Sequence, residues 1–269
     1  MIMNSTQKKQ FKRTLGRNAL PFCLLYLLIF INQGCNSNSA SDCFQNAGEI
    51  VRDEVVVAGF SQITVFENVR LIVAEGVEHK VEVETGSFLR NEVSITVEGS
   101  RLLLRDTNDC NYVRDYGITT VYVTAPELTE IRSSTGLPIR SEGVLNYADL
   151  TLISESFLNP ESETTDGDFD LDLNVENLAL IVNGITYFKL RGSAMDFNVQ
   201  IAAGDSRIEA ENLIAERVSI DHRGTNDLFV NPQQSLRGVI RGTGDVISSN
   251  RPPEVEIETL FNGKLIFKN

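Results

Sequence analysis

Residues 182–185 (VNGI), 202–205 (AAGD), 222–225 (HRGT) and 242–245 (GTGD) decide the predicted fold, because each carries a glycine at the same position. The four glycines, Gly184, Gly204, Gly224 and Gly244, are a constant 20 residues apart. Mostly apolar residues accompany them in register. Four residues before the glycines lie Leu180, Gln200, Ile220 and Ile240, and four after them lie Phe188, Ile208, Leu228 and Ser248.

Self-similarity at a period of this kind is typical of a solenoid, in which each repeat stacks on the next. We therefore expect an all-β, single-domain β-solenoid that resembles a right-handed β-helix. Each glycine would occupy a corner that requires a positive φ. Chance spacing and an ordinary meander are the alternatives.

Alternation of apolar and polar residues predicts strands over most of the remaining chain. The segments KVEVETG (80–86), VSITVEG (93–99), TTVYVTAP (119–126), DFDLDLNV (168–175) and EVEIETL (254–260) all show it. Residues 155–167 (ESFLNPESETTDG) are polar and contain a proline, so they predict an inserted loop. At the end of the chain, Asn262-Gly263 separates two strand patterns, which predicts a C-terminal hairpin that could cap the solenoid.

The beginning of the chain has the layout of a signal peptide, which we place at residues 1–34. An apolar run from Leu20 to Ile31 follows five basic residues, and it is shorter than the ~20 residues that a spanning helix needs. Gly34-Cys35 resembles a bacterial lipobox, which makes Cys35 the candidate for lipidation. Residues 35–45 would then form a polar, lipid-anchored tether and 46–269 the head domain. Ordinary cleavage, for example after Ala40, is the alternative.

Charge limits the classes of partner. The chain has 24 basic and 37 acidic residues, for a formal net charge of −13. Removal of residues 1–34 takes away five basic residues and no acidic one, which leaves −18. So acidic a surface disfavours nucleic acid and anionic membranes, because phosphate binding requires clustered Lys and Arg. We expect contact with the membrane only through a lipid anchor.

Two cysteines remain once Cys23 leaves with the signal peptide and Cys35 takes the lipid. In an exported protein, Cys43 and Cys110 most economically form one disulfide. The alternative is a pair of free or metal-binding thiols.

The strongest candidate for chemistry is a run of carboxylates at every second position: Asp166, Asp168, Asp170 and Asp172. On an extended strand these side chains would share one face, where Ca²⁺ could relieve their repulsion. The apolar Leu171 and Leu173 favour the simpler interpretation, a solvated outer face over an apolar inner face. The glycine and downstream glutamate of a calcium loop are missing.

Nothing in the sequence matches a catalytic motif such as G-x-S-x-G or H-E-x-x-H. His222 follows Asp221, but adjacent strand residues point to opposite faces, so we expect a structural histidine near a turn. His79 is expected to be solvated. The remaining enzymatic alternative is a polysaccharide-active β-helix, a lyase or hydrolase, although the chain lacks tryptophan for gripping sugar rings. We expect no enzyme activity and no cofactor.

Several segments occur together in a characteristic order: Phe60, Ile63 and Val65, a turn at Glu75-Gly76, and VYVTAPELTEI (121–131) leading to SSTG (133–136). In these features residues 50–250 resemble a known family, the GIN head domain of putative auto-transporter adhesins. The resemblance implies an elongated β-helical fold, display at the cell envelope, and a role in adhesion, scaffolding or surface recognition. The expected partner is an unknown surface protein or glycan. The lipid would hold the protein at the outer membrane, on a face that the sequence leaves open.

Overall fold

The computed structural model describes residues 42–157, 162 and 164–268. Its regular elements are 17 β-strands and two 3₁₀ helices, and this part of the chain contains no α-helix. The strands belong to one sheet. The all-β prediction is therefore confirmed. The signal peptide, Cys35 and residues 36–41 of the predicted tether lie outside the described residues.

The first ten strands and both 3₁₀ helices lie between Asp42 and Ser154. They are η1 (Asp42–Phe44), β1 (Ile50–Glu54), β2 (Gln62–Val65), β3 (Arg70–Glu75), β4 (Lys80–Gly86), η2 (Arg90–Glu92), β5 (Val93–Glu98), β6 (Arg101–Asp106), β7 (Thr120–Ala125), β8 (Glu130–Ser133), β9 (Pro138–Leu145) and β10 (Asp149–Ser154). Four long strands and three short ones follow. They are β11 (Asp168–Gly184), β12 (Tyr187–Gly204), β13 (Arg207–His222), β14 (Leu228–Ile240), β15 (Val246–Ser248), β16 (Glu254–Thr259) and β17 (Leu265–Phe267).

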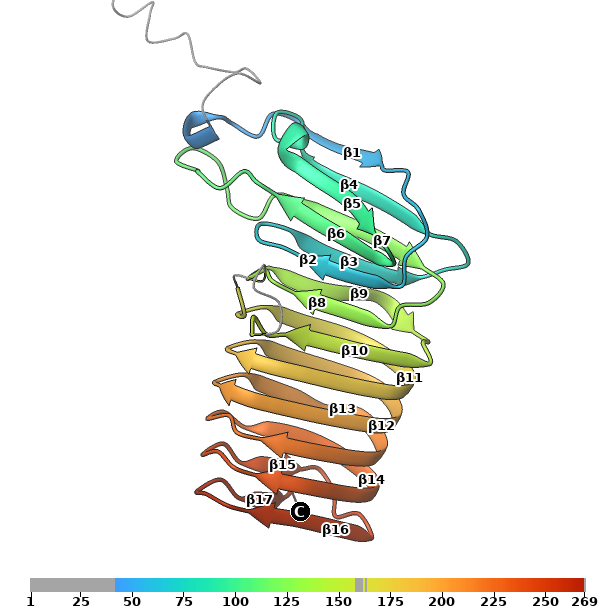
Figure 1. The fold of residues 1–269 in the computed structure, drawn as a ribbon, viewed down its shortest axis with the longest axis vertical. Coiled ribbons are helices and arrows are strands. Elements are labelled where there is room, and N and C mark those ends of the chain that lie inside the picture. Colours follow the sequence, from blue (N-terminus) through green and yellow to red (C-terminus); the bar gives the residue numbers. More distant parts are fainter. Residues whose placement is uncertain (1–41, 158–161, 163, 269) are drawn as a thin grey trace, which may run out of the picture.

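Strand pairing divides the sheet into two ladders that face each other across the core (Figure 1). The β9 ladder contains β1, β4, β7, β3 and β9, then the first halves of β11 to β14, then β15 and β17. The β10 ladder contains β5, β6, β2, β8 and β10, then the second halves of β11 to β14, then β16. Because β11 to β14 pass through both ladders, the sheet is continuous and strongly curled.

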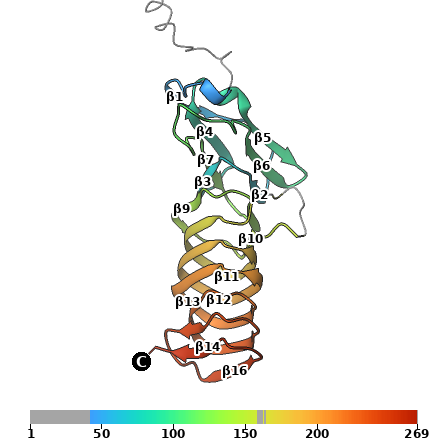
Figure 2. The ribbon, with the colours of Figure 1, turned by 90° about the vertical axis from the view of Figure 1, so that its left-hand side faces the viewer.

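From β11 onward the chain runs repeatedly through the β9 ladder and then through the β10 ladder. Each such run is called a coil. Paired residues in successive coils are 17 to 21 positions apart and run parallel, as Phe197 to Val218 and Val218 to Leu236 illustrate. The coils therefore stack along the long axis of the molecule, which a view turned by 90° also shows (Figure 2). Parallel pairing at steps close to 20 residues is what the glycine period predicted.

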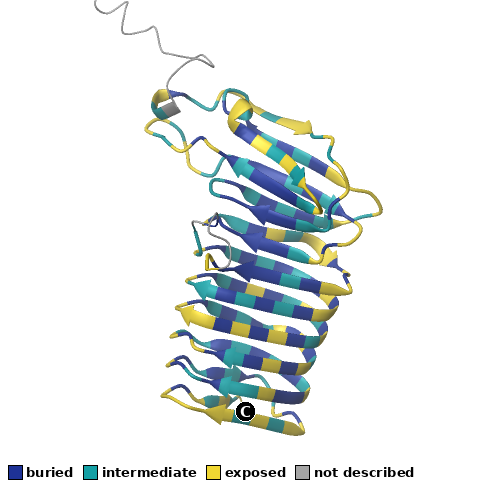
Figure 3. Cartoon of the chain, in the orientation of Figure 1, coloured by how far each residue is buried: buried dark blue, intermediate teal, exposed yellow. Residues whose placement is uncertain are grey.

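The core lies between the two ladders and continues from coil to coil. Alternate residues along each strand point inward and are buried, which produces the striped pattern of Figure 3. One buried column consists of Phe169, Phe188, Ile208, Leu228 and Val246. Apolar residues that stack in this way give each coil a partner above and below, so burial is shared along the axis.

The N-terminal end departs from simple stacking. Here β1 and β5 pair antiparallel with β4 and β6, and β4 pairs antiparallel with β7. Strands β2 and β3 are inserted beneath β6 and β7, although they precede them in the sequence. A disulfide joins Cys43 in η1 to Cys110 in the loop before β7, across 67 residues. This end of the stack is thus covered by antiparallel strands and a covalent bond.

The glycines act mainly through close contact between coils. Of the four repeat glycines, only Gly204 has a positive φ, +95°. The prediction that a positive φ requires glycine is therefore wrong for the other three. A Cβ at Gly204 would lie 2.0 Å from the carbonyl oxygen of Gly184, and one at Gly244 would lie 1.9 Å from that of Asn226. Any side chain there would collide with the backbone of the preceding coil.

The predicted C-terminal hairpin is wrong. In the structure β16 pairs parallel with β14, and β17 pairs parallel with β15. At the turn between them, the amide of Gly263 donates to the carbonyl of Gly242 in the preceding coil. Both segments therefore continue the stack, because each has an unpaired strand of the preceding coil to bind. Among the described residues, no helix is long and apolar enough to cross a membrane.

Candidate functional site

The first candidate is the aspartate face, the outward side of the β9 ladder over β11 to β13. Asp168, Asp170 and Asp172 project from β11, whereas Asp166 precedes the strand. Arg191 of β12 lies between two of them and donates to Asp170 at 2.5 Å and, through two nitrogens, to Asp172 at 2.7 and 3.1 Å. The carboxylates of Asp170 and Asp172 thus already have a cation from the chain itself.

Titration along this face follows those contacts. The hydrogen bond from Arg191 lowers the pKa of Asp172, and the carboxylates in turn raise the pKa of Arg191. Burial raises the pKa of Asp168, which does not contact Arg191. On the next coil Tyr187 and Arg207 both donate to Glu209. Ion pairs and hydrogen bonds within and between coils thus cover the aspartate face, which supports the interpretation of a solvated outer face.

The second candidate is the amide face, the outward side of the β10 ladder over the same coils. Register places Ala179, Asn198 and Ser219 in one column and Ile181, Gln200 and Asp221 in the next. Ion pairs flank these columns. Asp196 pairs with Arg217 at 2.6 Å on one side, and Asp221 pairs with Arg241 at 3.0 Å on the other.

Two shallow hollows lie on the amide face and share Ile181 and Gln200. One, of about 460 Å³, lies over β11 to β13 and is lined by Ala179, Asn198 and Ser219. The other, of about 470 Å³, extends toward Phe157, Asn183 and Arg223. Together they form a continuous depression that crosses three coils.

A third hollow, of about 650 Å³, lies at the corner between the ladders. Its wall is a chain of hydrogen bonds from coil to coil. Ser193 donates to Asn174 at 2.9 Å, Asn174 donates to Asn146 at 2.8 Å, and Asn146 donates to Glu75 at 2.7 Å. These polar groups satisfy one another, so the chain of hydrogen bonds stabilises the corner.

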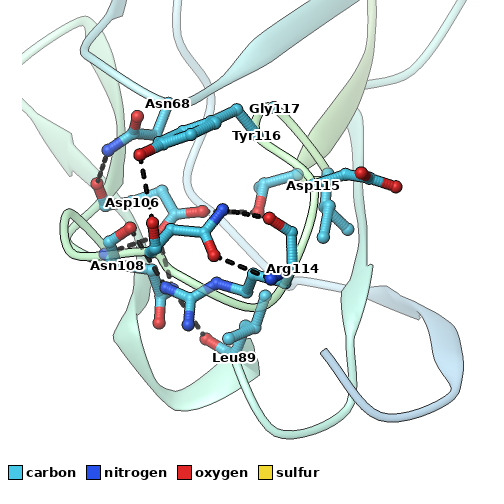
Figure 4. Close-up of a pocket in the computed structure, with 11 residues that line it drawn as sticks. Asn68, Leu89, Asp106, Asn108, Arg114, Asp115, Tyr116 and Gly117 are labelled. Atoms are coloured by element: carbon cyan, nitrogen blue, oxygen red, sulfur yellow. Dashed lines mark hydrogen bonds between the residues drawn. The ribbon is translucent and has the colours of Figure 1, made fainter. Parts of the chain in front are cut away.

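A small polar pocket of about 20 Å³ lies beside the disulfide (Figure 4). Arg114 donates to the carbonyls of Gln45 and Cys110, both at 3.0 Å. The buried Asp106 accepts from the hydroxyl of Thr119 at 2.5 Å and from the backbone N–H of Asn108 at 2.9 Å. Because these groups bind each other, the pocket holds the N-terminal loops in place.

Neither histidine belongs to a catalytic or metal site in the described part of the chain. His222 is fully buried in a column with Val182, Ile201 and Ile240, which excludes contact with a substrate. A strict 20-residue period would place Ala202 and Gly242 in this column, but the register between coils replaces them with residues one and two positions earlier. His79 is exposed and contacts Phe60 through its ring and its Nε2. No group of three His, Cys, Asp or Glu residues in the described part could hold a metal ion.

The sequence reasoning missed the amide face and the corner hydrogen bonds. Asn146 lies 71 residues from Glu75, and Asn174 lies 28 residues from Asn146. Single amide residues that lie so far apart in the sequence form no recognisable motif. Only the correct register between coils would have brought them together.

The fold and its two outward faces define a class: an elongated all-β protein whose stacked strands present long, shallow surfaces. Residues 59–252 match the family described as "Putative auto-transporter adhesin, head GIN domain". This chain belongs to that family. Among curated proteins, none matches it.

Solved structures have the same fold. A "putative adhesin" from Bacteroides fragilis is 18% identical, with 83% of this chain and 99% of that chain covered and a TM-score of 0.73. A "putative adhesin" from Parabacteroides merdae is 16% identical, with 82% and 97% covered and a TM-score of 0.57. A "putative lipid binding protein" from Parabacteroides distasonis is 15% identical, with 82% and 98% covered and a TM-score of 0.57. At these identities the likeness shows the fold alone.

Proposed function

We propose that this chain is the non-catalytic recognition head of a cell-envelope lipoprotein, with a β-solenoid body that acts in adhesion, scaffolding or surface recognition. The observation that carries the proposal is the stacking of parallel coils, which holds outward side chains of successive coils in register along two long faces. Such faces suit shallow contact at many points with a protein or glycan. Membership of the adhesin family supports the same role.

The anchor in this proposal is a lipid on Cys35, after removal of residues 1–34. Acyl chains contribute ~0.8 kcal/mol per buried methylene, so lipidation would hold the head at the outer membrane. The Cys35→Ser variant tests this step. We expect the wild-type chain in the membrane fraction and the variant in the soluble fraction. Equal distribution of the two would contradict the anchor.

A polysaccharide-active enzyme is the second candidate, and its specific support is the opposite pKa shifts of Asp168 and Asp172. Carboxylates that differ in this way can serve as acid and base. Four residues of extended strand separate them by ~13 Å, however, which exceeds the ~5–9.5 Å that glycoside hydrolysis requires. This separation argues against Asp168 and Asp172 as an acid and base pair, so recognition remains the first proposal.

Adhesion is tested with cells that express the full-length chain and cells that do not. Each is applied to surfaces coated with protein or with glycan. We expect more attachment by the expressing cells. The same purified chain, incubated with soluble polysaccharides, should release no new reducing or unsaturated ends. Release of such ends that is abolished by Asp168→Asn would favour the enzyme instead.

A further inference from the structure

The amide face is an uncharged area on an acidic protein. Asn198, Gln200 and Ser219 occupy its centre, and the chain as a whole carries a formal net charge of −13. Of the charged groups around it, Asp196 pairs with Arg217, Asp221 with Arg241 and Glu155 with Arg132, while Arg223 adds a cation at the edge of the second hollow. A ligand at this face would therefore meet little net charge.

Hydrogen-bonding capacity at the centre is unused. Within the described part of the chain, the side chains of Asn198, Gln200 and Ser219 form no hydrogen bond, and all three are exposed. The corner amides differ, because Asn146 and Asn174 bind one another. An amide both donates and accepts, as a hydroxyl does. The amide face thus offers free donors and acceptors side by side on adjacent coils.

Apolar surface lies among these polar groups. Ala179 and Ile181 lie beside Asn198 and Gln200 on the neighbouring strand, and Phe157 at the end of the depression is 85% exposed. Aromatic rings and aliphatic patches bind the apolar faces of sugar rings, while amides bind sugar hydroxyls. A neutral sugar chain presents both kinds of surface.

We propose that the amide face binds a neutral glycan along the depression from Ser219 to Phe157. This inference rests on the proposed recognition function and names the class of ligand. One exposed aromatic ring and a few amides give weak binding at each site, so a dense array of the protein on a surface would raise the avidity. Arg223 at the edge of the second hollow is the residue that an anionic glycan would use instead.

The test is binding of the full-length chain, clustered on beads, to an array of immobilised neutral and anionic glycans. The site variant is Asn198→Ala/Gln200→Ala. The matched control is Asn91→Ala/Gln234→Ala, which removes one exposed asparagine and one exposed glutamine away from the depression. Because hydrogen bonds contribute about 1 kcal/mol each, we expect the site variant to lose about tenfold or more in binding and the control to lose none. Phe157→Ala should also weaken binding.

The proposal would be overturned if no neutral glycan bound, or if the site variant bound neutral glycans as well as the wild-type chain does. It would also be overturned if only anionic glycans bound and Arg223→Gln abolished that binding. Attachment of expressing cells to protein-coated surfaces, combined with no glycan binding, would reject the glycan and keep the recognition function. Failure of both assays would reject the recognition function itself.

Discussion

Phe169 stacks on Phe188 one coil away, with ring centroids 4.7 Å apart and ring planes only 5° from parallel. Both rings are fully buried, and register places them in the same column. Successive coils are therefore joined by aromatic contact as well as by backbone hydrogen bonds. The column is a sensitive point for stability.

Truncation of this column should be costly. We expect Phe188→Ala to lower the free energy of unfolding by about 3–5 kcal/mol, because it removes a large buried side chain and leaves a cavity. Urea unfolding followed by circular dichroism measures the change. Phe157→Ala, at an exposed phenylalanine, should stay within about 0.5 kcal/mol of wild type. Similar losses for the two variants would contradict the stacked core.

Close contact between coils predicts that alanine substitution at two glycines lowers stability by different amounts. Gly204→Ala combines a φ of +95° with a clash at 2.0 Å against Gly184, so we expect a loss of about 2–4 kcal/mol. Gly99→Ala has a φ of +63° but no atom within 4 Å, so strain alone should cost about 1 kcal/mol. Chemical denaturation of both variants gives the comparison, and equal losses would mean that close approach of the coils is unimportant.

Arg191 and Asp172 should show a measurable but small coupling free energy. The side chains of Arg191, Asp170 and Asp172 are 32%, 30% and 40% exposed, so solvent screens the interaction. A double-mutant cycle with Arg191→Ala and Asp172→Asn should give a coupling of about 0.5–1 kcal/mol that decreases at 1 M salt. A coupling of zero at low salt would show that the contacts carry no stability.

His222 should make stability depend on pH. Burial lowers its pKa, so below the ordinary value of ~6.5 the unfolded chain binds a proton that the folded chain does not. Stability is therefore retained above pH ~6.5 and lost as the pH falls below it. Between pH 7.5 and 5.0 we expect wild type to lose up to ~2 kcal/mol more than His222→Leu, which fits the aliphatic column. The carboxylates near His222, Asp221 and Asp227, are present in both proteins, so the comparison isolates the histidine. Parallel pH curves would contradict this.

The disulfide should stabilise the N-terminal end. Its loop spans 67 residues, for which the chain-entropy model gives ~4 kcal/mol. We expect Cys43→Ser/Cys110→Ser to lower the free energy of unfolding by about 2–4 kcal/mol. Reduction of the wild-type chain with dithiothreitol should reproduce the loss, and a reduced chain as stable as the oxidised one would contradict it.

Much of the fold could be predicted from the glycine period and strand alternation, but the register could not. Phe188, Ile208 and Leu228 stack as the 20-residue period predicts, whereas the next member is Val246 and not Ser248. Leu180 stacks on Val199, so Gln200 faces solvent. Spacings of 17 to 21 residues between coils and irregular register at Lys189–Arg191 shift the columns, and no local pattern reveals such shifts.

The candidate site was predicted only in part. The aspartate run could be assigned to an outer face from alternation alone, but its partner Arg191 depended on the register of the next coil. The Asn262-Gly263 turn signal was misleading, because pairing with the preceding coil outweighed the local preference for a hairpin. The amides of the amide face have meaning only after stacking aligns them.

The disulfide also decides how mechanical load would travel through the molecule. A pull applied to the chain before Cys43 passes through the sulfur bridge to Cys110 and enters the body at β7, which lies between β3 and β4. The backbone between the two cysteines, with strands β1 to β6, forms a closed loop outside that line of force. An exported head under tension would therefore transmit force without having its first strands peeled away.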